Sequence, residues 1–348
     1  PGTPCFDSYN RKRATLVLSH IMLGKKVFRQ QAVTLQPGNE TMTIQREQLH
    51  TVQLVPITAF DAEGQLNLEP MTRLMARSYE AGIRVFLPCA GSAEFHALQP
   101  SEIISVIEMV REAVGDDAVI VAPTGYHAEH AIELANQAHS AGADVGLVMP
   151  LSFPYLSDAG ARDHLLRIFD QSKLPMMIYK KGDLPSDELL LELAEHENLI
   201  GIKYAVNDMD AFTRVIRADQ GRIDWFCGTA ERFAPFYALA GASGYTTGAG
   251  NICPRLTLAM QAAIVQGNWD EALRLQEILL PIEYYRSREN DSYNVSMLKH
   301  GIKQTGLDFG VPRPPQRQLT ELEMKEIDEM LVPILEAEAS IPVTSSEN

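Results

Sequence analysis

One lysine ends an apolar run in the middle of the chain. Residues 198–205 read Asn-Leu-Ile-Gly-Ile-Lys-Tyr-Ala, and an apolar run of this length between turn signals is typical of a buried strand. Most lysines at strand ends extend into water. If Lys203 is instead held out of water, desolvation lowers its pKa and leaves a free amine that can attack a carbonyl carbon. The surrounding chain therefore decides how Lys203 is interpreted.

The chain around Lys203 repeats one pattern, an apolar strand followed by an amphipathic helix. Spacings of roughly 20–35 residues are the size of one βα unit, and strands this apolar are covered on both faces. Eight such units predict a (β/α)₈ TIM barrel. A doubly wound sheet is the alternative, but no GxGxxG motif follows the first strand. The predicted strands span residues 52–58, 82–87, 118–122, 145–149, 175–179, 199–203, 223–227 and 243–247. The predicted helices span residues 66–81, 100–114, 127–141, 158–171, 186–196, 208–218 and 231–240, with an eighth from residue 254.

The remaining segments flank this barrel. Residues 1–50 are predicted to be an N-terminal extension that packs as an arm or a helical hairpin. The barrel is expected over residues 51–267, a C-terminal helical region over 268–340, and a loose tail over 341–348. Residues 11–23 combine a basic cluster with a short apolar run, but Ser19 and His20 interrupt the run. We interpret this segment as part of the extension rather than a signal peptide.

Composition narrows the class of partner. The net charge of −15 argues against nucleic acid or a membrane surface as partner. No apolar run approaches the roughly 18 residues of a membrane span. The four cysteines are scattered without a CxxC pair, which fits reduced thiols in a cytoplasmic protein and indicates no metal site. A cytoplasmic enzyme with a small-molecule substrate is the expectation.

In a barrel of this kind, reactive groups lie at the carboxyl ends of the strands or in the loops that follow. These positions hold a lysine, a tyrosine, small hydroxyl side chains and glycine-flanked amides, which suit an enzyme that forms an imine with a 2-oxo acid. The lysine is the nucleophile, the tyrosine relays protons, and the hydroxyls and amides bind a carboxylate. The candidate site residues are Thr58, Gly91, Ser92, Ala93, Glu94, Tyr179, Lys181, Lys203, Thr246, Thr247 and Gly248.

A structural interpretation competes with a functional one for Tyr179 and for four residues outside this list. Tyr179 could be a barrel plug whose hydroxyl bonds to backbone. His127 and His130 are spaced like half a metal site, but a solvated helix face is the stronger interpretation because no third ligand is implied. Cys89 and Cys227 at strand ends are interpreted as core packing, since no base stands beside them in the sequence.

Three motifs in this order are similar to those of a known family. Residues 90–95 (Ala-Gly-Ser-Ala-Glu-Phe), Ile178-Tyr179 and Gly201-Ile202-Lys203 resemble the dihydrodipicolinate synthase / N-acetylneuraminate lyase family of Schiff-base barrels. The resemblance covers about residues 51–337. Within the family, the chain is most similar to the 5-dehydro-4-deoxyglucarate dehydratases.

The resemblance implies roles for three of the candidate residues. Lys203 would form the imine, Tyr179 would shuttle protons, and Ser92 with nearby amides would hold the substrate carboxylate. The product of the dehydratase reaction would be 2,5-dioxopentanoate, formed with loss of water and carbon dioxide. The resemblance implies no metal or organic cofactor, and a homo-oligomer, either a tetramer or a dimer.

The chain also departs from the family pattern. Ser92 replaces the usual threonine and Ala93 the following glycine, so the carboxylate pocket is altered. The loop after Tyr179 differs from that of the dehydratases, although Lys180 or Lys181 could pair with a distal carboxylate. Two alternatives therefore stay open: a pyruvate-dependent aldolase or synthase of the same family, which would release or consume pyruvate, and a barrel that binds a metabolite without catalysis.

Overall fold

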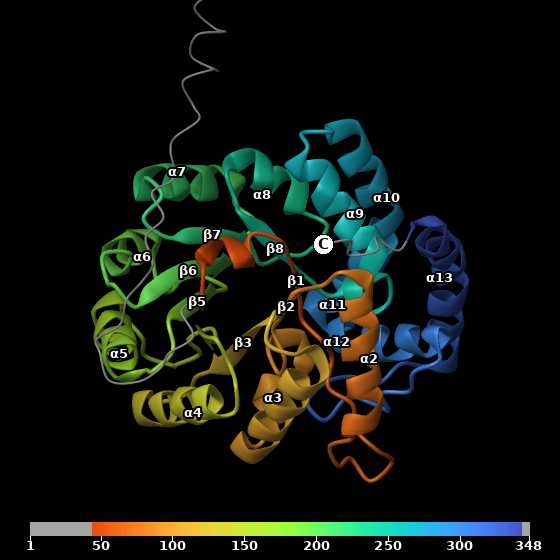
Figure 1. The fold of residues 1–348 in the computed structure, drawn as a ribbon, viewed down its shortest axis with the longest axis horizontal. Helices are drawn as coiled ribbons and strands as arrows, with labels where there is room; N and C mark the ends of the chain where they lie inside the picture. The colour runs from red at the N-terminus through yellow and green to blue at the C-terminus, as the bar shows by residue number, and fades with distance from the viewer. Residues whose placement is uncertain (1–43, 343–348) are drawn as a thin grey trace, which may run out of the picture. The chain divides into compact units, whose positions relative to one another are not determined.

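The computed structural model describes residues 44–342, and in this range eight parallel strands close into a barrel. Each strand pairs with the next along the chain, and β8 pairs with β1 (Figure 1). The strands are β1 (Val52–Leu54), β2 (Val85–Phe86), β3 (Val119–Thr124), β4 (Val145–Val148), β5 (Met176–Lys180), β6 (Leu199–Tyr204), β7 (Asp224–Cys227) and β8 (Gly244–Thr247). The predicted (β/α)₈ barrel is confirmed. Most of the predicted N-terminal extension, the whole of segment 11–23 and most of the predicted tail lie outside the described residues.

A helix follows each strand and packs on the outside of the barrel. These helices are α2 (Leu68–Ala81), α3 (Pro100–Val114), α4 (Ala128–Ser140), α5 (Asp158–Gln171), α6 (Asp187–Leu193), α7 (Met209–Asp219), α8 (Ala234–Ala240) and α9 (Pro254–Val265). The bounds follow from local chemistry. In α2, for example, the Asn67 side chain accepts from the Glu69 amide at the N-terminus, and Gly82 ends the helix at a φ of 111°.

Several predicted elements are shorter in the structure than in the sequence pattern. The strand predicted over residues 82–87 is Val85–Phe86, and the helix predicted over 186–196 is Asp187–Leu193. The first strand was expected to reach Thr58 but ends at Leu54, because Pro56 has no N–H to donate to a ladder. The helix expected from residue 231 begins at Ala234, with Pro235 in its first turn, where a missing N–H costs no helical bond.

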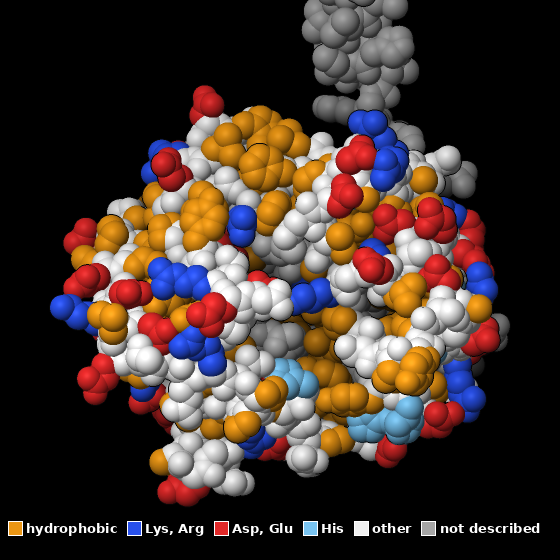
Figure 2. Space-filling view, turned by 180° about the vertical axis from the view of Figure 1, so that it is seen from behind, with side chains coloured by type: hydrophobic (Ala, Val, Ile, Leu, Met, Phe, Trp, Pro, Cys, Tyr) orange, Lys and Arg blue, Asp and Glu red, His pale blue; other side chains and the backbone are white. Residues whose placement is uncertain are grey.

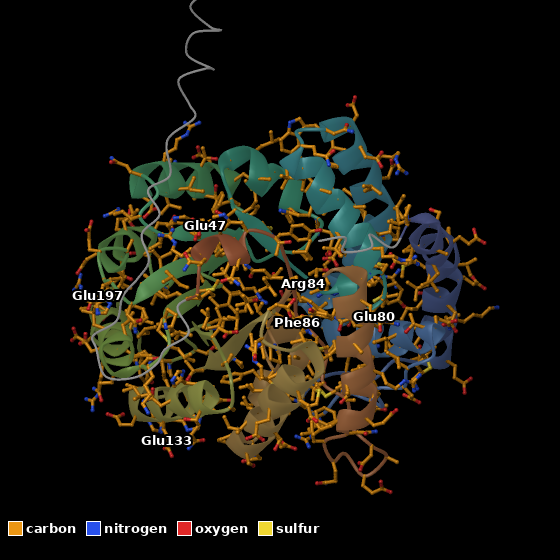
Figure 3. The ribbon with its side chains drawn as sticks, in the orientation of Figure 1. Glu47, Glu80, Arg84, Phe86, Glu133 and Glu197 are labelled. Atoms are coloured by element: carbon orange, nitrogen blue, oxygen red, sulfur yellow. The ribbon has the colours of Figure 1, made fainter. Side chains whose placement is uncertain are left out.

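The core lies between the strand ring and the helices. Figure 3 labels Phe86, which is fully buried inside the molecule, whereas the labelled Glu80 and Glu133 lie on the outer helices and are exposed. The short helix η1 (Arg46–Leu49) packs at the amino end of the barrel, where Arg46 forms an ion pair of 2.9 Å with Asp224 at the start of β7.

Further helices follow the barrel in the region that the sequence pattern predicts to be helical. They are α10 (Trp269–Arg286), the short turn α11 (Arg288–Asp291), α12 (Asn294–Gly301), the 3₁₀ helix η5 (Ile302–Thr305) and α13 (Glu321–Ser340). Helix α10 packs on α9, and α12 contacts η2 (Gly91–Ala93), the turn that follows β2. The C-terminal region therefore reaches the loops at the carboxyl ends of the strands.

Candidate active site

The lysine and tyrosine singled out in the sequence stand side by side on neighbouring strands. Tyr179 of β5 and Lys203 of β6 are register partners in the parallel ladder, so their side chains leave the sheet on the same face. The Lys203 Nζ lies 4.0 Å from the centre of the Tyr179 ring. Gly228, just after β7, permits this packing, because a Cβ there would lie 2.9 Å from the carbonyl oxygen of Tyr204 and 3.1 Å from Cγ of Lys203.

Lys203 is held out of water. Its side chain is 3% exposed, and burial is the main reason that its pKa falls from 10.5 to about 7, with the positive charges of Lys181 and Arg286 acting in the same direction. At neutral pH a large share of the molecules therefore carries the free amine. This is the state in which a lysine attacks a carbonyl.

Tyr179 keeps its proton under the same conditions. Burial raises the pKa of Tyr179 to about 12, and the negative charge of Asp291 contributes to the rise. The ring lies close to Gly91 in η2, where a Cβ would approach the phenol oxygen to 3.8 Å. The phenol is therefore a proton donor placed between Lys203 and the loop after β2.

A cavity opens at the carboxyl ends of the strands, above this pair. Of the predicted site residues, Ser92, Tyr179, Lys181, Lys203, Thr246, Thr247 and Gly248 line it. Figure 2 shows the face opposite to that of Figure 1, and it is hollowed near its centre with Lys or Arg and His side chains beside the hollow. The structure thus brings seven of the eleven predicted residues together.

The other four predicted residues lie behind the cavity wall. Gly91 packs against Tyr179, and Ala93 is fully buried. The Thr58 hydroxyl donates to the carbonyl oxygen of Ala93 at 2.7 Å. The arrangement of Thr58 and Ala93 fixes the turn that carries Ser92, and neither side chain faces the cavity.

Glu94, expected at the barrel mouth, is fully buried beneath the turn. Its carboxylate forms an ion pair of 2.8 Å with Lys299 of α12, whose side chain is 1% exposed, and it accepts from the Arg313 amide at 2.8 Å. Lys299 also donates to the carbonyl oxygen of Val311. Glu94 therefore ties the turn after β2 to the C-terminal helical region.

The two lysines after Tyr179 have different surroundings. Lys180 is buried and donates to the carbonyl oxygens of Gly182, Asp183 and Pro185 at 2.7–3.1 Å, so it holds the loop together. Lys181 extends to the mouth of the cavity, where it is more than half exposed and lies 3.5 Å from Asp291 of α11. Of the two, Lys181 is the one that a substrate can reach.

Sequence reasoning missed the residues that the C-terminal helices contribute. Arg286 and Glu283 of α10 and Asn294 of α12 line the cavity, and Arg286 pairs with Glu283 in surroundings where both side chains are about 6–7% exposed. These residues lie after the eighth βα unit. The expectation that reactive groups lie at the carboxyl ends of strands therefore does not apply to them. The run of helical residues after 268 indicates these helices but not which of their side chains reach the cavity.

A buried carboxyl group lies behind β8. Glu231 is fully buried, and its Oε1 accepts from the Thr247 hydroxyl, which in turn accepts from the Gly250 amide at 2.8 Å. Burial raises the pKa of Glu231, and the nearby charge of Glu283 raises it further. The Thr247 hydroxyl is therefore oriented by its two bonds where it lines the cavity.

Residues 44–342 contain neither a cluster of metal-binding side chains nor a membrane-spanning helix. No group of three or more His, Cys, Asp or Glu side chains in this part of the chain is arranged to hold a metal ion. None of the helices in the same range is long and apolar enough to cross a membrane.

Comparison with known proteins agrees with the motifs. The model of a family described as "Dihydrodipicolinate synthetase family" matches residues 48–333. A Streptomyces avermitilis protein named "Probable 5-dehydro-4-deoxyglucarate dehydratase 1" is 31% identical over 288 residues, which are 79% of this chain and 90% of that protein. A Ralstonia nicotianae protein named "Probable 5-dehydro-4-deoxyglucarate dehydratase" is 32% identical over 256 residues, which are 71% of this chain and 81% of that protein. The crystal structure of dihydrodipicolinate synthase from Oceanobacillus iheyensis superposes with a TM-score of 0.79 at 33% identity, over 82% of this chain and 96% of that one.

Proposed function

The chain belongs to the dihydrodipicolinate synthetase family, and we propose that it is the member that dehydrates and decarboxylates a 3-deoxy-2-oxo sugar acid, 5-dehydro-4-deoxyglucarate. The observation that carries the proposal is the buried Lys203 amine, with a pKa lowered to about 7, beside Tyr179 in a cavity that also holds cationic side chains. The names of the two relatives indicate the substrate.

Lys203 begins the reaction as the neutral amine. At pH 7.5 about three quarters of a lysine with a pKa near 7 is neutral, against about 0.1% at the ordinary value of 10.5. The amine attacks the ketone carbon, and the carbinolamine loses its hydroxyl as water to give a protonated imine. Tyr179, which stays protonated because its pKa is raised to about 12, donates the proton that this leaving hydroxyl needs.

The iminium then serves as the electron sink for the two bond cleavages. It acidifies the neighbouring C–H, so that a proton leaves and the β-hydroxyl departs as water. The distal carboxylate next leaves as carbon dioxide, and its bonding electrons move into the conjugated chain. Protonation and hydrolysis of the imine release 2,5-dioxopentanoate and return Lys203.

The test is to incubate the protein with 5-dehydro-4-deoxyglucarate and to quantify carbon dioxide and 2,5-dioxopentanoate, with Lys203→Ala as control. Equal amounts of both products, absent with the variant, are expected. Products without carbon dioxide, or equal rates for the two proteins, would rule out the decarboxylating reaction through Lys203.

The second candidate is a pyruvate-dependent aldolase or synthase on the same machinery. Its support is the 33% identity to a structure named dihydrodipicolinate synthase. Measuring pyruvate release or consumption separates the two, because the dehydratase releases carbon dioxide and no pyruvate. We also propose a homo-oligomer, tetramer or dimer, which light scattering on the purified protein would measure.

A further inference from the structure

Arg286 is a buried cation in the wall of the cavity, and the family motifs do not include it. It is the last residue of α10 and its side chain is about 6% exposed. Glu283, one turn earlier, pairs with its Nη1, and its Nη2 donates to Oδ1 of Asn294 at 2.9 Å. These two contacts fix the plane of the guanidinium.

The guanidinium faces the turn after β2. Its Nη2 lies 3.4 Å from the Ser92 hydroxyl oxygen. Arg286, from the C-terminal helical region, therefore contacts the turn after β2. The Nε is buried and has no hydrogen-bond partner among residues 44–342. A buried donor without a partner is unfavourable, and an acceptor supplied by a ligand would satisfy it.

The end of β8 is shaped to admit this side chain. Gly248 follows β8 directly, and a Cβ at this position would lie 2.4–2.5 Å from three guanidinium atoms of Arg286. Since no real Cβ makes such contacts, any other residue at 248 would displace the guanidinium. Gly248 was predicted from the sequence to be a site residue, and this close approach of Arg286 explains why the position requires glycine.

We propose that Arg286 binds the carboxylate next to the reacting ketone, beside the Ser92 hydroxyl, and that its guanidinium sets the preference for a charged carboxylate at this position. The inference rests on the imine chemistry of the proposed function. The planar fork of a guanidinium matches the two oxygens of a carboxylate, and each charge-assisted bond is short and strong.

Depth in the cavity assigns Arg286 to this carboxylate rather than to the distal one. Arg286 is as buried as Lys203, and its charge is close enough to act on the pKa of both Lys203 and Tyr179. Lys181 is more than half exposed at the mouth. The carboxylate bonded to the ketone carbon must lie as deep as the Lys203 amine, whereas the distal end of a six-carbon acid extends towards Lys181.

The experiment measures imine formation with two probes that share the reacting ketone, pyruvate and its neutral methyl ester. Each is incubated with the full-length protein and borohydride, and the adduct on Lys203 is quantified by peptide mass against probe concentration. The ratio of half-saturating concentrations reports how much the free carboxylate contributes to binding. Neither probe has the β-hydroxyl or the distal carboxylate on which the later steps act, so the readout is independent of those steps.

The variants separate a binding role from a structural one. Arg286→Gln alone leaves Glu283 buried without its partner, which destabilises the fold. The double variant Arg286→Gln/Glu283→Gln removes both charges, and Gly248→Ala keeps both charges but displaces the guanidinium. Arg274→Gln is the matched control, because Arg274 lies on the same helix, is exposed and pairs only with Glu271 among the described residues.

The preference for pyruvate over its methyl ester is expected to fall about 10- to 100-fold in the double variant and in Gly248→Ala. This is the effect of losing one charge-assisted contact. The preference should be unchanged in Arg274→Gln. If the wild type forms the adduct but the preference is unchanged in the double variant and in Gly248→Ala, the role of Arg286 is overturned while the proposed function stands. If the wild type forms no adduct on Lys203 with either probe, the proposed function fails, and this inference fails with it.

Discussion

Replacing Lys203 with methionine is expected to abolish imine formation and, at the same time, to stabilise the fold. The side chain is 3% exposed and its ammonium rests against the Tyr179 ring. A charged group in such surroundings has lost its hydration, and only the reaction requires it. Methionine has a similar length, no charge and adaptable packing, so it fills the same space without the desolvation cost.

The size of the effect follows from the pKa. The value for Lys203 falls from 10.5 to about 7, and since each unit corresponds to about 1.36 kcal/mol, burying the ammonium costs up to about 5 kcal/mol. Because the folded-state pKa lies below the unfolded one, the unfolded chain binds more protons between the two values. The cost is therefore fully present below pH 7 and is relieved as pH rises towards 10.5.

Lys299→Met is the matched control, and it should act in the opposite direction. Lys299 is equally buried, but its ammonium is paired with the buried carboxylate of Glu94 at 2.8 Å. Removing one member of a buried pair leaves the other charge uncompensated, which costs about 3–5 kcal/mol. The same substitution, at two lysines of equal burial, is thus expected to raise stability at 203 and to lower it at 299.

The assay is the melting temperature of wild type and both variants between pH 6 and pH 10. Lys203→Met should melt several degrees above wild type at pH 6, since about 1 kcal/mol shifts the melting temperature by roughly 2–4 °C in domains of 150–250 residues. The difference should shrink steadily towards pH 10. A Lys203→Met protein that melts below wild type, or a difference that is the same at every pH, would refute the account of Lys203 as an unfavourably buried charge.

Two further predictions concern neighbouring groups. Tyr179→Phe should lower kcat by about 10²–10⁴-fold, because it removes a positioned proton donor. Borohydride should still trap the imine on Lys203 in this variant after a longer incubation. A variant with the kcat of wild type would exclude the role of Tyr179 in proton transfer. Glu231→Gln should raise the melting temperature relative to wild type by an amount that grows between pH 5 and pH 8. The pKa of Glu231 is raised in the folded state, so the stability that the protonated carboxyl contributes is fully present below about pH 4.5 and is lost as pH rises through the folded-state pKa. A difference that does not change with pH would contradict a protonated, buried Glu231.

The sequence was sufficient for the barrel because its signals are local and repeat. Each strand is a short apolar run and each helix has one apolar face, so the bounds of α5, for example, coincide with the predicted 158–171. Lys203 and Tyr179 could be found by the same route. In a parallel barrel, consecutive strands are neighbours, and residues at their carboxyl ends meet in space.

Residues whose surroundings depend on distant segments could not be placed in this way. Glu94 follows a strand and was expected at the mouth, but Lys299, some 200 residues later in the sequence, pairs with it beneath the turn. Lys180 and Lys181 are adjacent and identical in type, yet one bonds three carbonyl oxygens of its own loop and the other reaches the mouth. No pattern in the chain distinguishes them, because the difference is made by the fold of the loop.

The same reasoning explains where selectivity is expected to reside. The imine pair sits on β5 and β6, inside the ring of strands, where replacing either residue removes the chemistry itself. Arg286 and Asn294 come from α10 and α12, outside the ring, and reach the cavity from the C-terminal region. Substitutions there can change which acid is held over Lys203 without disturbing the strand ladder. If the preference for pyruvate over its methyl ester depends on Arg286 and Gly248, then the C-terminal helices determine the substrate and the barrel determines the reaction.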